Sequence, residues 1–299
     1  MSDLATVPGW LRVKRRALDA AHPLAAHCEL TYRCNWRCVF CYNPRHHDRR
    51  NLSTAEWVGV VDELRALGVL MVTLTGGEPL AHPGFLEIAR SVRERNLAFR
   101  VLTNGALVTD AVATSLAELQ PLGAELSLHG ARAETHDRAT GLRGSFEAMK
   151  LGLDRLRDRG IPTLVKTPLT SINESELEEV VALAESWDVP HQLDANITPR
   201  DDGDPAPLAF RASRTGVETL YRLVAQKGNL PETTREAGGL NCGIGRITMA
   251  VDPEGDVFPC FQWRQSAMGN VRDTRLRDLW KTSTLRAEAA QVAVDANAA

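Results

Sequence analysis

Three of the six cysteines lie within a stretch of eight residues, at Cys34, Cys38 and Cys41. A structural zinc site needs four ligands, usually supplied in two pairs, and only His46 and His47 follow closely. A cubane iron-sulfur cluster accepts three thiolates and leaves one iron open. A small molecule can be chelated and reduced at such an iron. The spacing therefore favours an iron-sulfur cluster, with a zinc knuckle or three incidental thiols as the alternatives.

A second group of candidates follows two apolar runs of the chain. These candidates are Gly76, Gly77, Glu78 and Pro79, after the run 69–75, and Ser127, near the end of the run 124–128. Two adjacent glycines let the backbone approach a ligand closely. The carboxylate of Glu78 can accept a hydrogen bond from an ammonium group. Behind the cysteine triplet, this turn predicts a ligand contact.

Together these motifs resemble the signature of radical S-adenosylmethionine (SAM) enzymes. The triplet is followed by Tyr42 and preceded by the run from Glu29 to Arg33, and the resemblance covers roughly residues 28–196. It implies that the three cysteines hold a 4Fe-4S cluster whose open iron is chelated by the amino and carboxylate groups of SAM. It also implies the activity: reductive cleavage of SAM to a 5'-deoxyadenosyl radical, which abstracts hydrogen from the substrate.

The resemblance further implies roles for side chains around SAM. In the family, the Gly-Gly-Glu-Pro motif contacts the methionyl amino group, a role that falls here on residues 76–79. A polar side chain at the end of the fourth strand, here Ser127, contacts the ribose or methionine, and an aromatic side chain between the cysteines, here Phe40, lies near the adenine. Arg138 and Arg143 either pair with the methionine carboxylate or are solvated surface residues. No protein residue is assigned a catalytic role, because the chemistry is that of the cofactor.

The elements between these motifs must position them. Short apolar runs alternate with amphipathic segments, which predicts strand-helix units and a parallel sheet. Six units are fewer than the eight of a closed TIM barrel, so we expect an open, partial (β/α)6 TIM-like α/β barrel. Its reactive groups should gather at the C-terminal ends of the strands. The expected strands are 28–32, 69–75, 99–103, 124–128, 163–167 and 191–196.

Capping signals mark the expected helices. Ser53 and Glu56 form a capping box ahead of apolar residues at helical spacing, and Gly68 is the stop signal. Asn173 and Glu176 are expected to cap a later helix in the same way. Further helical patterns follow Ser145 and cover 83–96 and 110–119.

After residue 200 the character of the sequence changes. An acidic, turn-rich link at 201–207 marks the expected domain boundary. We divide the chain into an N-terminal segment at 1–27, a barrel core at 28–200 and an extension at 201–299. In the extension, apolar runs at 247–251 and 256–259 flank a hairpin signal, and a short helix is expected at 275–280.

Two further cysteines bracket this hairpin. Cys242 and Cys260 resemble the opening of the SPASM and twitch extensions, in which paired cysteines bind auxiliary clusters, so both are candidate metal ligands. The chain has no cysteine after Cys260 and no histidine after His191, and two thiolates do not complete a four-ligand cluster. Either part of the extension has been lost, or an auxiliary iron-sulfur cluster is incomplete, unusually ligated or absent. Cys28 starts a strand and is interpreted as a core thiol rather than a missing ligand.

The resemblance leaves the substrate open. SPASM-type enzymes mostly modify peptides, so the leading hypothesis is modification of a ribosomally synthesised precursor peptide. The alternatives are a twitch-type dehydrogenase or tailoring enzyme of a sugar or small metabolite, and a non-catalytic iron-sulfur or zinc scaffold. An external electron donor such as flavodoxin or ferredoxin is the expected partner. About 27 residues ahead of Cys28 are too few for a packed peptide-recognition module, which counts against the peptide hypothesis.

Composition limits the other partners. The chain has 299 residues, of which 43% are hydrophobic and 24% charged, so it can bury a sizeable core. A formal net charge of −3 gives no reason to expect nucleic acid or an acidic membrane surface as a partner. No apolar run is long enough to predict a transmembrane helix, and the basic run at 14–16 lacks the apolar block of a signal peptide. A cytoplasmic protein is expected.

Overall fold

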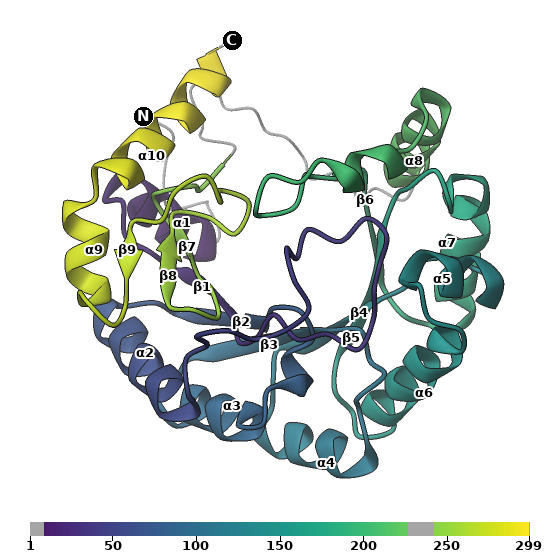
Figure 1. Ribbon diagram of the computed structural model, residues 1–299, viewed down its shortest axis with the longest axis horizontal. Helices are drawn as coiled ribbons and strands as arrows, with labels where there is room; N and C mark the ends of the chain where they lie inside the picture. Colours follow the sequence, from purple (N-terminus) through teal and green to yellow (C-terminus); the bar gives the residue numbers. More distant parts are fainter. Residues whose placement is uncertain (1–8, 227–241, 299) are drawn as a thin grey trace.

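The computed structural model describes residues 9–226 and 242–298. One nine-stranded sheet dominates it, in the order β6-β5-β4-β3-β2-β1-β7-β8-β9. Helices cover the outer side of the sheet, which curves without closing (Figure 1). The strands are β1 (Ala25–Glu29), β2 (Met71–Thr75), β3 (Ala98–Thr103), β4 (Gly123–Ser127), β5 (Thr163–Pro168), β6 (His191–Asp194), β7 (Thr248–Val251), β8 (Asp256–Phe258) and β9 (Gly269–Asn270). The expected open, partial barrel is confirmed.

Each neighbouring pair from β1 to β6 is parallel, as the intervening helices require. The α-helices are α1 (Gly9–Asp19), α2 (Thr54–Leu67), α3 (Phe85–Glu94), α4 (Asp110–Leu119), α5 (Ala133–Thr140), α6 (Ser145–Arg157), α7 (Leu177–Ser186), α8 (Arg214–Gln226), α9 (Leu276–Thr282) and α10 (Thr284–Ala298). The 3-10 helices of the described ranges are η1 (Pro79–Ala81), η2 (Glu174–Glu176) and η3 (Ala206–Phe210). No helix of the described ranges is long and apolar enough to cross a membrane.

The extension adds strands to the barrel sheet itself. β7 pairs in parallel with β1, with Ala26 opposite Met249, and β8 folds back on β7 as the expected antiparallel hairpin. We expected six parallel strands, and β7 supplies a seventh to the same sheet. Hydrophobic alternation along one strand does not reveal which distant strand it pairs with, so this contact had no local signal.

Local capping explains why α2 begins where it does. The Ser53 side chain accepts a hydrogen bond from the Glu56 N–H, and the Glu56 side chain accepts one from the Ser53 N–H, which is the predicted capping box. At the other end Gly68 adopts a left-handed conformation, with φ +89°. The buried face of α2 includes Trp57 and Leu64, which are fully buried between the helices and the sheet.

The second predicted cap is wrong. Neither Asn173 nor Glu176 makes a side-chain capping bond, although η2 and α7 begin there. Instead Asn173 donates to the carbonyl oxygens of His129 and Pro168, and Glu176 accepts from the Thr135 hydroxyl. Both side chains are buried connectors between β-α loops. Long-range partners outcompeted the local cap, because a buried polar group must be satisfied wherever a partner lies.

Four helices, α1, α5, α8 and α10, were not predicted. The alanine-rich C-terminal helix shows why, because its contact face consists of small side chains. Ala289, Ala290 and Ala293 are buried, and a Cβ at Gly245 would lie 3.0 Å from the Ala290 nitrogen. The backbone of another segment therefore packs closely against this helix. Large apolar side chains, whose periodicity would have indicated a helix, are not needed for this contact.

Candidate active site

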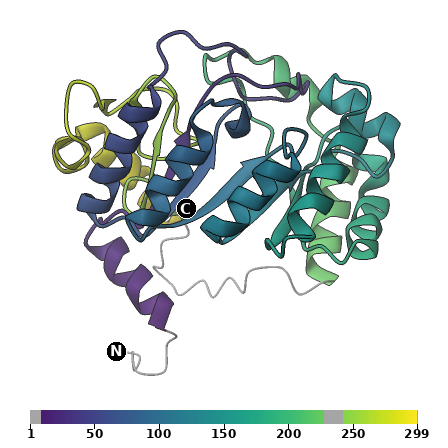
Figure 2. The same cartoon turned by 90° about the horizontal axis from the view of Figure 1, so that it is seen from below.

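The loops that follow the strands gather along one edge of the sheet, the upper edge in Figure 2. A cavity of about 840 Å³ opens there, inside the curve of the barrel. Parallel strands bring their carboxyl ends to the same edge, so motifs far apart in sequence line one space. Among the predicted site residues, the lining includes Cys34, Cys38, Cys41, Phe40, Gly76, Gly77 and Ser127.

The cysteine loop follows β1 and reaches across to α5. The Arg37 N–H donates to the Thr140 carbonyl at 2.9 Å, and the Val39 N–H donates to the Ala139 carbonyl at 3.0 Å. At the far end of the loop, the Asn43 side chain donates to the Tyr32 carbonyl at 2.8 Å. These backbone contacts hold a segment without regular secondary structure in one conformation.

The chemistry of the three thiols fits an iron-sulfur cluster. All three are free and half-buried, and burial raises the pKa of Cys38 well above its ordinary value and that of Cys41 to about 11. Thiolates at such positions need a bound cation to be stable. No three His, Cys, Asp or Glu side chains of residues 9–226 and 242–298 are grouped to hold a single metal ion. In a cubane each sulfur binds a different iron, which spreads the ligands apart.

Cys34 is held by hydrogen bonds to its sulfur. The Trp36 N–H donates to Sγ at 3.4 Å and the Asn104 side chain donates at 3.8 Å. Asn104 also donates to the Asn35 side chain at 2.7 Å. The sequence analysis did not single out Asn104 as a site residue. Only the packing of the β3 end against the cysteine loop reveals it.

The two glycines are required because two loops of the chain lie in close backbone contact. A Cβ on Gly76 would lie 2.6 Å from the Thr31 carbonyl oxygen, and a Cβ on Gly77 would lie 2.5 Å from the Arg33 carbonyl oxygen. Gly76 also has φ +129°. The sequence interpretation attributed both glycines to the approach of a ligand. In the structure they let the loop after β2 lie directly against the cysteine loop.

Glu78 does not line the cavity, although its partners Thr103 and Asn104 do. Its carboxylate is fully buried and accepts hydrogen bonds from the Leu80 N–H, the Thr103 hydroxyl and the Asn104 N–H at 2.7–3.1 Å. Pro79 begins η1 and is buried beside it. The carboxylate is therefore committed to the end of β3. The cavity-lining part of this motif is the Gly76-Gly77 backbone, whose carbonyl groups are acceptors suited to an ammonium group.

The remaining predicted SAM contacts lie at different places. Ser127 ends β4 and lines the cavity, as does Phe40, whose ring centroid lies 5.0 Å from that of His129. Arg138 and Arg143 are exposed and do not line the cavity. Of the two interpretations left open for these arginines, the placement favours surface residues.

Polar side chains from three strands line the part of the cavity beyond Ser127. Alternate residues of a strand face the same side, and the lining pairs follow this rule: Glu125 and Ser127 of β4, Lys166 and Pro168 of β5, and Asp194 and Asn196 at β6. Glu125 forms ion pairs with Lys166 and with Arg100, the latter at 2.7 Å. Burial acts to raise the pKa of Glu125, but the opposite effect of these two cations is larger, and the pKa is lowered. This region is charged yet internally paired.

A buried ion network joins the barrel to the extension. Arg264 of the extension pairs with Glu29 at the end of β1, and its Nε lies 3.7 Å from Asp201 Oδ2. The Arg264 and Glu29 side chains are 7% and 2% exposed. We expected Asp201 to lie in an acidic, turn-rich link at the domain boundary. Its side chain is only 14% exposed and borders the cavity, because a partner 63 positions further along the chain draws it inward.

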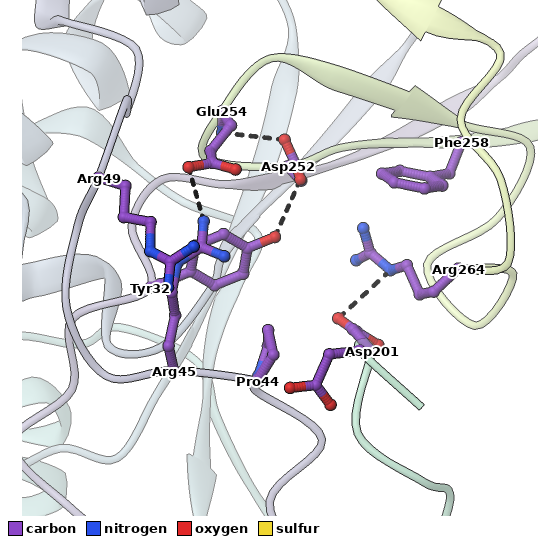
Figure 3. Close-up of a pocket in the computed structure, with 10 residues that line it drawn as sticks. Tyr32, Pro44, Arg45, Arg49, Asp201, Asp252, Glu254, Phe258 and Arg264 are labelled. Atoms are coloured by element: carbon purple, nitrogen blue, oxygen red, sulfur yellow. Dashed lines mark hydrogen bonds and ion pairs between the residues drawn. The ribbon is translucent and has the colours of Figure 1, made fainter. Parts of the chain in front are cut away.

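A smaller cavity of about 310 Å³ lies on the other side of this network. Figure 3 shows Arg264 and Asp201 facing Tyr32 across it. The Tyr32 hydroxyl donates to Asp252 at 2.9 Å, and the Arg45 guanidinium lies 4.3 Å from the centre of the Tyr32 ring. Asp201 and Arg264 line both cavities, so this network is the wall between them.

The second pair of cysteines does not complete a cluster site. Cys242 is exposed and Cys260 is half-buried. Burial raises the pKa of the Cys260 thiol most, and the nearby Cys242 thiol raises it further. Thr248 lies near both, with its hydroxyl within reach of the Gly243 and Pro259 carbonyls. These two thiols provide half of the four ligands of a cubane. They do not by themselves fit a complete auxiliary cluster.

Comparison with known proteins identifies the class of enzyme. A model of the radical SAM superfamily matches residues 28–184, and a model of SPASM, an iron-sulfur cluster-binding domain, matches residues 242–297. The chain belongs to the radical SAM superfamily and carries a SPASM extension. It is therefore an enzyme whose cofactors are a 4Fe-4S cluster and SAM.

Individual relatives share this arrangement over most of the chain. Mycofactocin maturase MftC of Mycobacterium tuberculosis is 30% identical over 297 residues, covering 93% of this chain and 75% of the relative. PqqA peptide cyclase of Ruegeria pomeroyi is 29% identical, with 86% and 74% covered. The crystal structure of Streptococcus suis SuiB bound to S-adenosylmethionine superposes with a TM-score of 0.73 at 17% identity, covering 93% of this chain and 72% of SuiB. This last likeness shows a shared fold.

Gly77→Ala is expected to displace the cysteine loop. The added Cβ would lie 2.5–2.6 Å from two backbone carbonyl oxygens, which cannot move aside as a flexible side chain does. We expect most of the iron bound after anaerobic reconstitution to be lost, with about 1–3 kcal/mol of destabilisation from overpacking. Gly59→Ala is the matched control, because nothing lies within 4 Å of its Cβ position. Wild-type iron content in Gly77→Ala would contradict the packing argument.

Glu78 is expected to make stability depend on pH. Burial raises the pKa of its carboxyl from 4.5 to about 7, although its hydrogen-bond donors oppose the shift. A carboxyl with a raised folded-state pKa stabilises the folded state fully below the unfolded pKa, and this contribution is lost as pH rises through the folded pKa. The unfolding free energy of wild type minus that of Glu78→Gln should therefore fall between about pH 5 and pH 8. Urea unfolding at several pH values measures it, and parallel pH curves would refute it.

Proposed function

We propose that this enzyme uses radical SAM chemistry to modify a ribosomally synthesised precursor peptide. The names of the matched relatives support this substrate class: one is a maturase and another a peptide cyclase. A further structure with the same fold is SuiB bound to its precursor peptide SuiA. The main structural support for this proposal is that the three thiols and the polar strand residues line the same cavity.

We assign the cofactors to the thiol end of that cavity. Cys34, Cys38 and Cys41 would hold the cluster, while the Gly76-Gly77 backbone, Ser127 and Phe40 would contact SAM. With both cofactors bound, the chemistry supplied is one-electron cleavage of the sulfonium and hydrogen abstraction from an unactivated carbon.

The protein's own contribution is to hold and orient. Trp36 and Asn104 donate hydrogen bonds to the Cys34 sulfur, which fixes the ligand and withdraws electron density from it. Glu78 and Pro79 act through the backbone they position.

The substrate would occupy the polar end of the cavity. A peptide presents alternating N–H donors and carbonyl acceptors, and this end offers both kinds of partner. Asp194 and Asn196 supply acceptors and donors from β6, while Arg264 brings a donor from the extension. The proposed substrate-binding end of the cavity is thus formed by residues at the end of β6 and by residues of the extension.

Cys242 and Cys260 remain candidate metal ligands. A cluster at this pair would need two ligands from a substrate, a partner or another part of the chain. We also propose an external electron donor such as flavodoxin or ferredoxin, and a cytoplasmic location, where the reducing environment keeps thiols free to bind iron.

Cys38→Ala is the first test of this function. Loss of one thiolate is expected to reduce 5'-deoxyadenosine formation from SAM to background, together with most of the bound iron. Anaerobic reconstitution, dithionite reduction and chromatographic detection of 5'-deoxyadenosine measure the result. Cys28→Ala is the matched control, since Cys28 is buried in the core and should leave the product unchanged. If the wild-type enzyme formed no 5'-deoxyadenosine, the proposal would be refuted.

The substrate class requires a separate experiment. A peptide encoded by a short reading frame beside the gene should change mass when incubated with the enzyme, SAM and reductant. Mass spectrometry of the peptide detects the change, and Cys38→Ala enzyme serves as the control. Turnover of a sugar or other small metabolite, with the peptide unchanged, would overturn the peptide assignment.

A further inference from the structure

The cysteine loop has residues that line the cavity and residues that are exposed to solvent. Its three thiols line the cavity, while Arg33, Asn35 and Arg37, which flank Cys34 and precede Cys38, are exposed. Electron transfer between proteins weakens steeply with distance. A donor that reduces a cluster on these thiols therefore gains the shortest route by docking on the outer side of this loop.

That outer side is positively charged. Arg37 packs against the turn after α5, where a Cβ at Gly141 would lie 2.9 Å from the Arg37 carbonyl oxygen. This contact brings the exposed Arg138 and Arg143, at the end of α5 and just beyond it, beside the exposed Arg37. Figure 1 shows the loop after β1 crossing the open side of the sheet toward α5. We call Arg33, Arg37, Arg138 and Arg143 the arginine face.

Little of this charge is neutralised within the chain. Arg33 lies 3.8 Å from Asp48, with its side chain 58% exposed. Arg37, Arg138 and Arg143 form no salt bridge with residues of the two described ranges. Instead Arg37 donates to the Cys34 and Trp36 carbonyls, and Arg138 donates to the Ile172 carbonyl. The chain as a whole carries a net charge of −3, so the positive potential here is local.

We propose that the arginine face is the docking surface for an acidic electron-transfer protein. The proposal rests on the proposed radical SAM function, which requires an electron, and adds where the donor binds. Complementary charge steers such encounters and sets their orientation more than it adds affinity. Two of these exposed arginines belong to the cysteine loop and two to the turn packed against it, so an acidic partner docked here lies next to the loop that carries the thiols. Arg138 and Arg143, which do not reach the cavity, thereby have a function.

The test compares two reductants on the same enzyme. The Arg138→Glu/Arg143→Glu double variant reverses two charges without touching a cysteine or a cavity-lining residue. Formation of 5'-deoxyadenosine is measured in the reconstituted enzyme, with reduced flavodoxin as the donor and, separately, with dithionite. We expect the flavodoxin concentration for half-maximal rate to rise roughly tenfold or more at low salt, with the dithionite rate unchanged. Added salt should slow wild type with flavodoxin and narrow the difference from the variant.

The matched control carries the same change in net charge elsewhere. Arg90→Glu/Arg157→Glu alters exposed residues of α3 and of the last turn of α6. It should behave as wild type with both reductants. An equal loss in the control variant and the arginine-face variant would overturn the docking surface. So would a parallel fall in the dithionite rate, because the arginines would then act on the cofactors. Failure of the proposed function looks different, since wild type would form no product with dithionite.

Discussion

The close contact between the loops after β1 and β2 is the constraint on which the site depends. The thiols sit on a loop without regular structure, so something rigid must fix their positions. The backbone at Gly76 and Gly77 does this, because it lies where any side chain would collide with the carbonyl groups of Thr31 and Arg33. Backbone hydrogen bonds from Gly77 and Glu78 to Thr31 and Arg33, at 2.7 and 2.8 Å, complete the contact.

The third strand closes a circle of contacts around this site. Glu78 extends from the second loop to the end of β3, where it accepts hydrogen bonds from Thr103 and Asn104. Asn104 in turn reaches back to the sulfur of Cys34. Three adjacent strand ends are thus tied to one another through a buried carboxylate and an amide. The three donors satisfy the oxygens of this fully buried carboxyl, although burial still raises its pKa to about 7.

The predictions that succeeded depend on local sequence, and those that failed depend on distant partners. The cysteine spacing from which the family was predicted and the Ser53-Glu56 box are each contained within a few residues, so they can be recognised without the fold. Asn173 and Glu176 show the same local pattern as that box but bond to side chains and backbone of distant loops. Asp201 lies in a sequence typical of a solvated turn, and only Arg264 explains its burial. The succession of strands and helices in the barrel could be predicted from the alternation of apolar and amphipathic segments. The pairing of β7 with β1 could not be predicted in this way.

The pairing of β7 with β1 has a consequence for how such an enzyme can change over time. It sets Phe261, Gln262 and Gln265, which come after the hairpin, into the wall of the large cavity. The three thiols and Ser127 come from chain before residue 130, and these three side chains come from chain after residue 250. Mutations at these late positions can therefore reshape one wall of the cavity while the loop that carries Cys34, Cys38 and Cys41 keeps its sequence, which lets one thiol loop serve cavities of many shapes.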